Sequence, residues 1–305
     1  MKKEKIKVYD CFPFFNELEL LEIRFKELSD CVDHFIICEA TKSYNGKAKP
    51  LYYKENKERY KKWEDKITHL IYEPINLGLK YKFFCWMSNF SFMKNKICGR
   101  IYTILNLAKR EIETRQRNYL VNGLKNAREE DLIFLSDVDE VWNKEKLPEI
   151  KQKITNNNII KLSQDMYYYY LNGKATMKWE SANVVKYSFL KNKIKKPDYI
   201  RNLKISERIL GPLFKIRPYK KKQVLIKNGG WHFSYLGGEE KVRNKIENTT
   251  HFEHNSEEKK NKVKEMVNKG MHIGDPNVKI KYIKINKTFP KTIKNNLNKY
   301  KHLIK

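Results

Sequence analysis

The chain has 305 residues, of which 40% are hydrophobic and 13% aromatic, so it can bury a large core and is too apolar to be disordered. No apolar run approaches the roughly 18 to 20 residues that a membrane-spanning helix needs, and charge interrupts the basic N-terminus too soon for a signal peptide. These features argue against a transmembrane or secreted protein and predict a cytoplasmic one.

The net charge of +28 is concentrated in two lysine-rich stretches. Residues 191–222 carry 12 basic and 2 acidic side chains, and the chain from Ser256 onward carries 14 lysines, no arginine and 4 acids. Arginine, the usual bidentate reader of bases, is therefore scarce where the charge is densest. We expect no specific binding of nucleic acid. The lysines form either a solvated surface or one attracted to a phosphorylated partner or an acidic membrane surface.

The five cysteines all lie in the first third of the chain, are odd in number and have no CxxC spacing. A disulfide framework or a zinc ribbon would need regular pairs. Free thiols in a reducing compartment are the expected state. The residues are Cys11, Cys31, Cys38, Cys85 and Cys98.

The first half of the chain alternates strand and helix patterns. Apolar runs predict strands at 5–12, 34–40, 68–74 and 132–135, and helical spacing predicts helices at 16–28 and about 100–126. This alternation predicts an α/β fold with a mainly parallel sheet flanked by helices. Ligands bind such sheets outside the carboxyl ends of the strands. Asp10, Glu39 and the acids of residues 137–140 fall at or just past those ends, so together they form a site hypothesis.

The second half is less regular. Strands are predicted at 158–172 and 222–238, followed by helices near 239–250 and 256–270. The tyrosines of residues 167–170 alternate between the faces of the first of these strands, where a sheet core accounts for them better than sugar stacking does. There is no internal repeat, so one domain with an elaborated C-terminal half is expected.

The stretch LIFLSDVDEV, residues 132–141, ends a buried strand on three acids, Asp137, Asp139 and Glu140. Carboxylates this close raise the cost of ionising one another, so a positive partner is expected. An Asp-x-Asp turn can hold a hard divalent cation through oxygen, and such a cation can stabilise a diphosphate leaving group. The alternative is that these acids cap the helix predicted after them.

Four stretches of the chain together resemble glycosyltransferase family 17. They are YDCFPFFNELELLEIRFKELSDCVDHFIICEATKSYNGKAKPLYY (9–53), RQRNYLVNGL, LIFLSDVDEV and GGWHFSYLGGEE. The resemblance covers most of residues 8–270 in the same order. It implies a GT-A domain over 1–275, with a nucleotide-binding half of about 1–145 and an acceptor half of about 146–275, and it leaves 276–305 as a lysine-rich C-terminal extension.

The same resemblance implies an inverting transfer of a sugar, N-acetylglucosamine, from a UDP-sugar donor to a glycan acceptor. Mn²⁺ or Mg²⁺ would bridge the donor diphosphate, held by Asp137 and Asp139. His232 is a third candidate ligand or a diphosphate donor, with a structural histidine as the alternative, and His251 and His254 are weaker candidates. Trp231 lies beside it at a glycine-flanked strand end, where backbone can approach a ligand closely.

Several further residues are candidates for binding the donor. Asn16 and Glu17 match the opening motif of the family and could touch the nucleotide, although Asn16 could equally cap the helix after it. Glu39 could accept from the ribose or the uracil, or could form a structural salt bridge. Arg115 and Arg117 are two apart on a helix and cannot face the same way, so at most one reaches the diphosphate.

The catalytic base is expected among the acids after the glycine turn of GGEE. Inversion in one displacement needs a carboxylate on the acceptor side. Glu240 is the first candidate and Glu239 the second, with Asp165 and Glu180 as rivals and a plain helix-start charge as the alternative. The competing function is a basic nucleic-acid-binding protein or a metal-dependent nuclease, but no nucleic-acid-binding module is recognisable.

Overall fold

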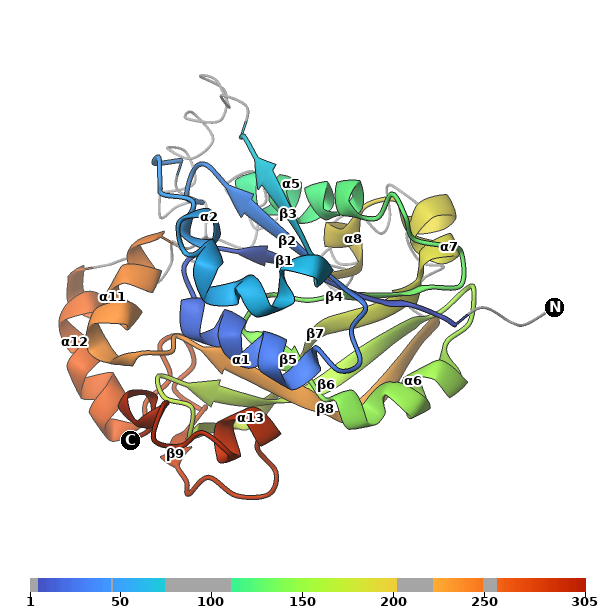
Figure 1. Cartoon of the computed structure of the whole chain (residues 1–305). Helices are drawn as coiled ribbons and strands as arrows, with labels where there is room; N and C mark the ends of the chain where they lie inside the picture. The colour runs from blue at the N-terminus through green and yellow to red at the C-terminus, as the bar shows by residue number, and fades with distance from the viewer. Residues whose placement is uncertain (1–4, 45, 75–110, 202–221, 249–256) are drawn as a thin grey trace, which may run out of the picture.

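The computed structural model of the chain describes residues 5–44, 46–74, 111–201, 222–248 and 257–305 (Figure 1). One sheet organises these residues. Its strands are β1 (Val8–Phe14), β2 (His34–Ala40), β3 (Ile67–Tyr72), β4 (Leu132–Leu135), β5 (Glu140–Trp142), β6 (Ile159–Tyr168), β7 (Gly173–Lys186), β8 (Gln223–Ser234) and β9 (Ile280–Tyr282). The helices are α1 (Leu18–Leu28), α2 (Tyr52–Glu55), α5 (Glu111–Tyr119), α6 (Leu147–Lys153), α7 (Tyr187–Phe189), α8 (Pro197–Arg201), α11 (Gly238–Asn248), α12 (Glu257–Lys269) and α13 (Lys291–Lys294). Shorter helical turns are η1 (Lys57–Lys66), η3 (Leu120–Gly123), η4 (Lys144–Lys146), η5 (Leu190–Ile194) and η8 (Lys301–Leu303).

The strand order is β3-β2-β1-β4-β7-β6-β8-β5, and β9 pairs with β7. In the first half β1, β2, β3 and β4 run parallel, as expected from their alternation with helices. In the second half β6 and β8 run parallel, whereas β7 is antiparallel to β4, β6 and β9, and β5 is antiparallel to β8. The expectation of a mainly parallel sheet therefore holds only in part, and the fold is a mixed α/β one.

The strand β7 joins the two halves and was not expected from the sequence. Its residues, GKATMKWESANVVK, alternate only weakly because lysines and a glutamate interrupt the apolar positions. Only its second part is continuously buried, from Ala182 to Val185, where it lies between β4 and β6. Long-range pairing with two flanking strands therefore determines this element more than its own pattern does.

Helices cover both faces of the sheet (Figure 1). One core cluster contains residues of α1, η1, α6 and α13, and a second contains residues of α5, η3, α7, η5 and α8. A third lies at the ends of β6 and β8, under α11 and α12, and it includes Tyr168 and Tyr169. Tyr167 is buried in the first cluster, so the predicted packing role of these tyrosines is confirmed. None of the described helices combines the length and apolar character that a membrane crossing would need.

The lysine-rich segment 276–305 is part of the folded core. It supplies β9 to the sheet, and Phe289, Ile293, Tyr300 and Leu303 are buried in the first cluster. Glu27 of α1 fixes the segment through its carboxylate, which accepts from the backbone N–H groups of Lys291 at 3.2 Å and Thr292 at 2.7 Å. The division at residue 275 stays a prediction, but the residues beyond it complete the sheet and cover α1.

Candidate active site

A buried arginine shapes the turn that carries the acidic cluster. Arg24 of α1 is fully buried and binds both carboxylate oxygens of Asp10, with Nη2 2.6 Å from Oδ1 and Nε 2.7 Å from Oδ2. Its Nη1 donates to the main-chain carbonyls of Asp137 at 2.8 Å and Glu140 at 2.9 Å. Asp10 is thus a structural counter-ion inside the sheet and not a residue of the site edge. The guanidinium fixes where the backbone after β4 turns, and hence where the acids point.

The positive partners of the acidic cluster in this structure are two further arginines. Asp137 binds Arg117 of α5, with Nη2 3.0 Å from Oδ1, and binds Arg201 of α8 through its other oxygen. Arg201 also binds Glu140, which is fully buried, at 2.9 Å. These four residues are called the arginine–carboxylate cluster below. Burial alone would lower the pKa of Arg117, but nearby carboxylates, Asp137 first, raise it well above its usual value, so the guanidinium stays charged.

The second aspartate of the turn faces a histidine. The Oδ1 atom of Asp139 lies 3.3 Å from Nε2 of His232, and both side chains are buried. The strand pairing of β5 with β8 places His232 opposite Glu140. Within the described residues, Nδ1 of His232 is buried without a hydrogen-bond partner. The imidazole packs on the ring of Trp179, with ring centroids 4.8 Å apart, and Trp179 Nε1 donates to Glu140 at 2.5 Å.

The side chains of Asp139 and His232 fit a divalent cation better than Asp137 does. Carboxylate oxygen and imidazole nitrogen are ligands that Mn²⁺ accepts, and the atoms of this pair that face each other are Oδ1 of Asp139 and Nε2 of His232. Within the described ranges, no group of three or more His, Cys, Asp and Glu side chains is gathered to hold a metal ion. A cation bound here would therefore take its other ligands from substrate phosphates and water, as is usual for Mg²⁺ sites.

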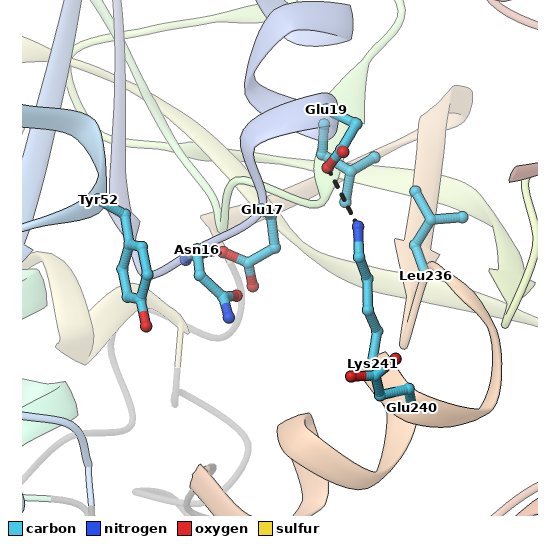
Figure 2. Close-up of a pocket in the computed structure, with 8 residues that line it drawn as sticks. Asn16, Glu17, Glu19, Tyr52, Leu236, Glu240 and Lys241 are labelled. Atoms are coloured by element: carbon cyan, nitrogen blue, oxygen red, sulfur yellow. Dashed lines mark hydrogen bonds and ion pairs between the residues drawn. The ribbon is translucent and has the colours of Figure 1, made fainter. Parts of the chain in front are cut away.

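A pocket of about 370 Å³ opens between the start of α1 and the start of α11 (Figure 2). We call it the α1–α11 pocket. It is lined by Asn16, Glu17, Glu19, Leu20, Tyr52, Leu236, Glu240 and Lys241. Three residues that the sequence singled out, Asn16, Glu17 and Glu240, are therefore brought together from opposite ends of the chain.

The structure does not use Asn16 as a helix cap. The residue before α1 is Glu17, and no side chain caps the helix. Glu17 Oε2 instead accepts from the backbone N–H of Asn16 at 3.1 Å, and the Asn16 side chain points into the pocket (Figure 2). The helix-cap alternative for Asn16 is therefore wrong.

Burial raises the pKa of the Tyr44 hydroxyl, just past β2, well above its usual value; Glu113, Asp137 and Glu17 raise it further, and Arg117 lowers it. Asn16 and Glu17 of the pocket follow β1, and Asp137 of the cluster follows β4, so both lie past the carboxyl ends of parallel strands.

Two predicted donor-binding residues lie in the interior. Glu39 is completely buried, and its carboxylate accepts from Tyr53 N at 3.0 Å and faces His69 Nε2 at 3.0 Å. It therefore stabilises the start of α2, which is the structural alternative. Trp231 points to the other face of β8 from His232, and its Nε1 donates to Thr288 O at 2.8 Å. Neither side chain reaches the arginine–carboxylate cluster.

The remaining candidates are engaged in ion pairs elsewhere. Arg115 points away from Arg117, as expected, and binds Glu111 on the surface of α5. Glu239 pairs with Arg243 at 3.0 Å along α11 and does not line the pocket, in contrast to Glu240. Asp165, a rival for the base, binds both Lys174 and Lys178.

Three other expectations concern helix capping by the acids, the state of the cysteines, and the two histidines of residues 251–254. The acids of residues 137–140 do not cap the helix that follows, because Asn143 caps η4 by accepting from Glu145 N at 3.1 Å. Cys11, Cys31 and Cys38 are free thiols, as predicted. His251, His254, Cys85 and Cys98 lie outside the described residues.

The sequence analysis did not find Arg24 or Arg201. A signal for Arg24 was present, since it lies three positions after Leu21 and four before Leu28, on the apolar face of α1. A basic residue on that face needs a buried counter-ion, and Asp10 was nearby in the chain. Arg201 gave no such signal, because it lies in a lysine-rich stretch 64 positions after its partner Asp137.

The mixed sheet flanked by helices, with acids and arginines gathered past its strand ends, is compatible with a glycosyltransferase. Residues 1–85 match the sequence model of glycosyltransferase family 17. This match supports the assignment of the chain to that family, and it supports a glycosyltransferase enzyme as the class of the protein. The matched range carries β1 to β3 with Asn16 and Glu17, and it ends before the arginine–carboxylate cluster. No curated protein matches the chain.

Proposed function

We propose that the protein is an inverting, metal-dependent glycosyltransferase of the GT-A type that moves N-acetylglucosamine from its UDP-sugar to a hydroxyl group of a glycan. The observation that carries this proposal is the gathering of Arg117, Arg201 and the Asp139–His232 pair past the end of β4, together with a pocket that Glu240 lines. The family match supports sugar transfer as the reaction and gives no support to the competing nuclease function.

The donor diphosphate would bind at the arginine–carboxylate cluster. Guanidinium groups recognise phosphate oxygens through paired hydrogen bonds. Arg117 is buried and the Arg201 side chain is 11% exposed, and both contact Asp137. Asp139 and His232 would hold Mn²⁺ or Mg²⁺, which when bound would offset part of the diphosphate charge. Arg201 would exchange contacts with Asp137 for contacts with a phosphate, which keeps its charge paired throughout.

The transfer itself would be a single displacement. The acceptor oxygen forms a bond to the anomeric carbon as the bond from that carbon to the phosphate oxygen breaks, and UDP leaves with the electron pair. Glu240 would take the proton of the acceptor hydroxyl. Its position in the first turn of α11, near the positive end of the helix, favours the ionised carboxylate that a base requires.

A nucleotide-sugar screen tests this function. Release of the nucleoside diphosphate would be measured for the purified chain against a panel of UDP-, GDP- and CMP-sugars, with Mn²⁺, with Mg²⁺ and with EDTA. We expect turnover of UDP-N-acetylglucosamine that depends on the cation. Equal turnover in EDTA would contradict the metal assignment, and a preference for another nucleotide would contradict the donor.

A further inference from the structure

Acids outnumber cations by three to one in the lining of the α1–α11 pocket, and this charge affects which ligands it can bind. Glu17, Glu19 and Glu240 line it together with one cation, Lys241. Burial alone would raise the pKa of Glu19, but hydrogen bonds from its own backbone and from Lys241 lower it, so this carboxylate is charged. A diphosphate would be repelled by these carboxylates. A neutral ligand rich in hydroxyl groups can donate to the carboxylates without that cost.

The walls of the pocket also suit a sugar ring. Its volume of about 370 Å³ is at the small end of the range for small-molecule sites. Leu20 and Leu236 give apolar surface, and Tyr52 presents an aromatic ring toward the cavity (Figure 2). A pyranose has an apolar C–H face and a rim of hydroxyl groups, so it matches a cavity with aromatic and aliphatic walls and a carboxylate rim.

A glycine turn positions the side of the pocket that carries Glu240. Gly237 has φ +111°, and a Cβ atom there would lie 2.3 Å from Cδ of Lys241. Glycine therefore lets the Lys241 side chain lie across the turn, and its Nζ reaches Glu19 Oε2 of α1 at 3.4 Å. This contact ties the start of α11 to the start of α1 across the cavity, so that Glu240 faces Glu17 and Asn16 at a defined separation (Figure 2).

We propose that the α1–α11 pocket binds the neutral sugar residue of the acceptor that receives the transferred group, with Glu17 orienting it and Glu240 facing the reacting hydroxyl. This inference rests on the proposed function and makes it more specific. It assigns Asn16 and Glu17 to the binding of the acceptor, whereas the family resemblance assigns them to the binding of the nucleotide.

Binding and turnover are measured separately to test the pocket. The probes are the methyl glycosides of glucose, galactose, mannose and N-acetylglucosamine, with binding followed by saturation-transfer NMR on the intact chain, and UDP affinity is measured by calorimetry. Glu17→Gln removes one acceptor of hydroxyl hydrogen bonds, and Leu236→Trp fills the cavity without changing its charge. Glu265→Gln is the matched control, because Glu265 is an exposed residue of α12 that pairs with Lys269 at 2.8 Å, far from the proposed chemistry.

We expect at least one glycoside to bind the unmodified chain and the control, and its affinity to fall by roughly tenfold or more in both pocket variants, with UDP affinity unchanged. Glycoside binding that is equal in all variants, or absent from the unmodified chain, would overturn the inference. So would a loss of UDP affinity in Glu17→Gln, because that result would return Glu17 to the donor site. If glycoside binding follows the expected pattern but no nucleotide sugar is turned over, the pocket stands and the proposed function fails.

Discussion

Replacing Arg24 with methionine should destabilise the protein strongly, although Arg24 contacts no proposed substrate. The change removes the guanidinium that pairs with the fully buried Asp10 carboxylate, and it leaves the carbonyls of Asp137 and Glu140 without this donor. Breaking a buried ion pair by deleting one partner costs about 3–5 kcal/mol, because the other charge stays buried and uncompensated. That loss compares with a total stability of about 5–15 kcal/mol for a typical domain.

The measurement is urea unfolding followed by circular dichroism, with Arg59→Met as the matched control. Arg59 pairs with Glu22, on the same helix as Arg24, but is 33% exposed, and Glu22 keeps its pair with Lys26. Such pairs are worth about 0–1 kcal/mol. We expect Arg24→Met to lower the free energy of unfolding by several times more than Arg59→Met. Similar losses in the two variants would refute the reasoning that Arg24 organises the turn through a desolvated ion pair.

Three further predictions concern the site and the acid stability of the fold. Asp139→Asn should lower cation-dependent transfer by roughly 10² or more with little change in melting temperature. Asp137→Asn should also lower the melting temperature, because Arg117 and Arg201 lose the carboxylate that contacts them both; equal melting temperatures would count against the arginine–carboxylate cluster. Glu240→Gln should retain UDP affinity while transfer falls by roughly 10², and wild-type turnover would remove Glu240 as the base. Burial alone would raise the pKa of Glu22, but hydrogen bonds from three basic side chains lower it from 4.5 to about 2. The ionised Glu22 carboxylate therefore stabilises the fold above pH 4.5, and this stabilisation is lost as the pH falls toward 2. Glu22→Gln should therefore flatten the dependence of unfolding free energy on pH in that window, and an unchanged slope would contradict the assignment.

The parallel half of the sheet could be predicted because its strands are short apolar runs separated by helical spacing. The same local signals predicted that Asp137 and Asp139 end a buried strand at the site edge. The approach of Glu240 to Asn16 could be expected only from the family resemblance, since it depends on α11 packing beside α1. Local pattern carries no information about such an approach.

The errors at the site have a common physical origin, which is the direction in which a side chain points. Alternation along β8 implied that Trp231 and His232 face opposite ways, but not which of them faces the acids. Glu39 ends its strand as predicted, yet its carboxylate turns inward to the start of α2. Asp137 does have a positive partner, as expected, and Arg201 is part of it. The position of Arg201 depends on the packing of α8 against β7, which the residues next to Arg201 in the sequence do not predict.

The contact of residues 286–305 with α1 has a consequence for the order in which the fold can form during synthesis. When α1 and β1 leave the ribosome, more than two hundred residues separate them from Phe289 and Ile293, which pack against α1, and from Thr292, whose backbone N–H donates to Glu27. The same segment is bound at its far end by Asn172, whose side chain donates to Lys305 O at 2.7 Å. The nascent N-terminal half must therefore wait with an apolar face of α1 uncovered, and a fragment ending before residue 286 would keep that face exposed and be prone to aggregate.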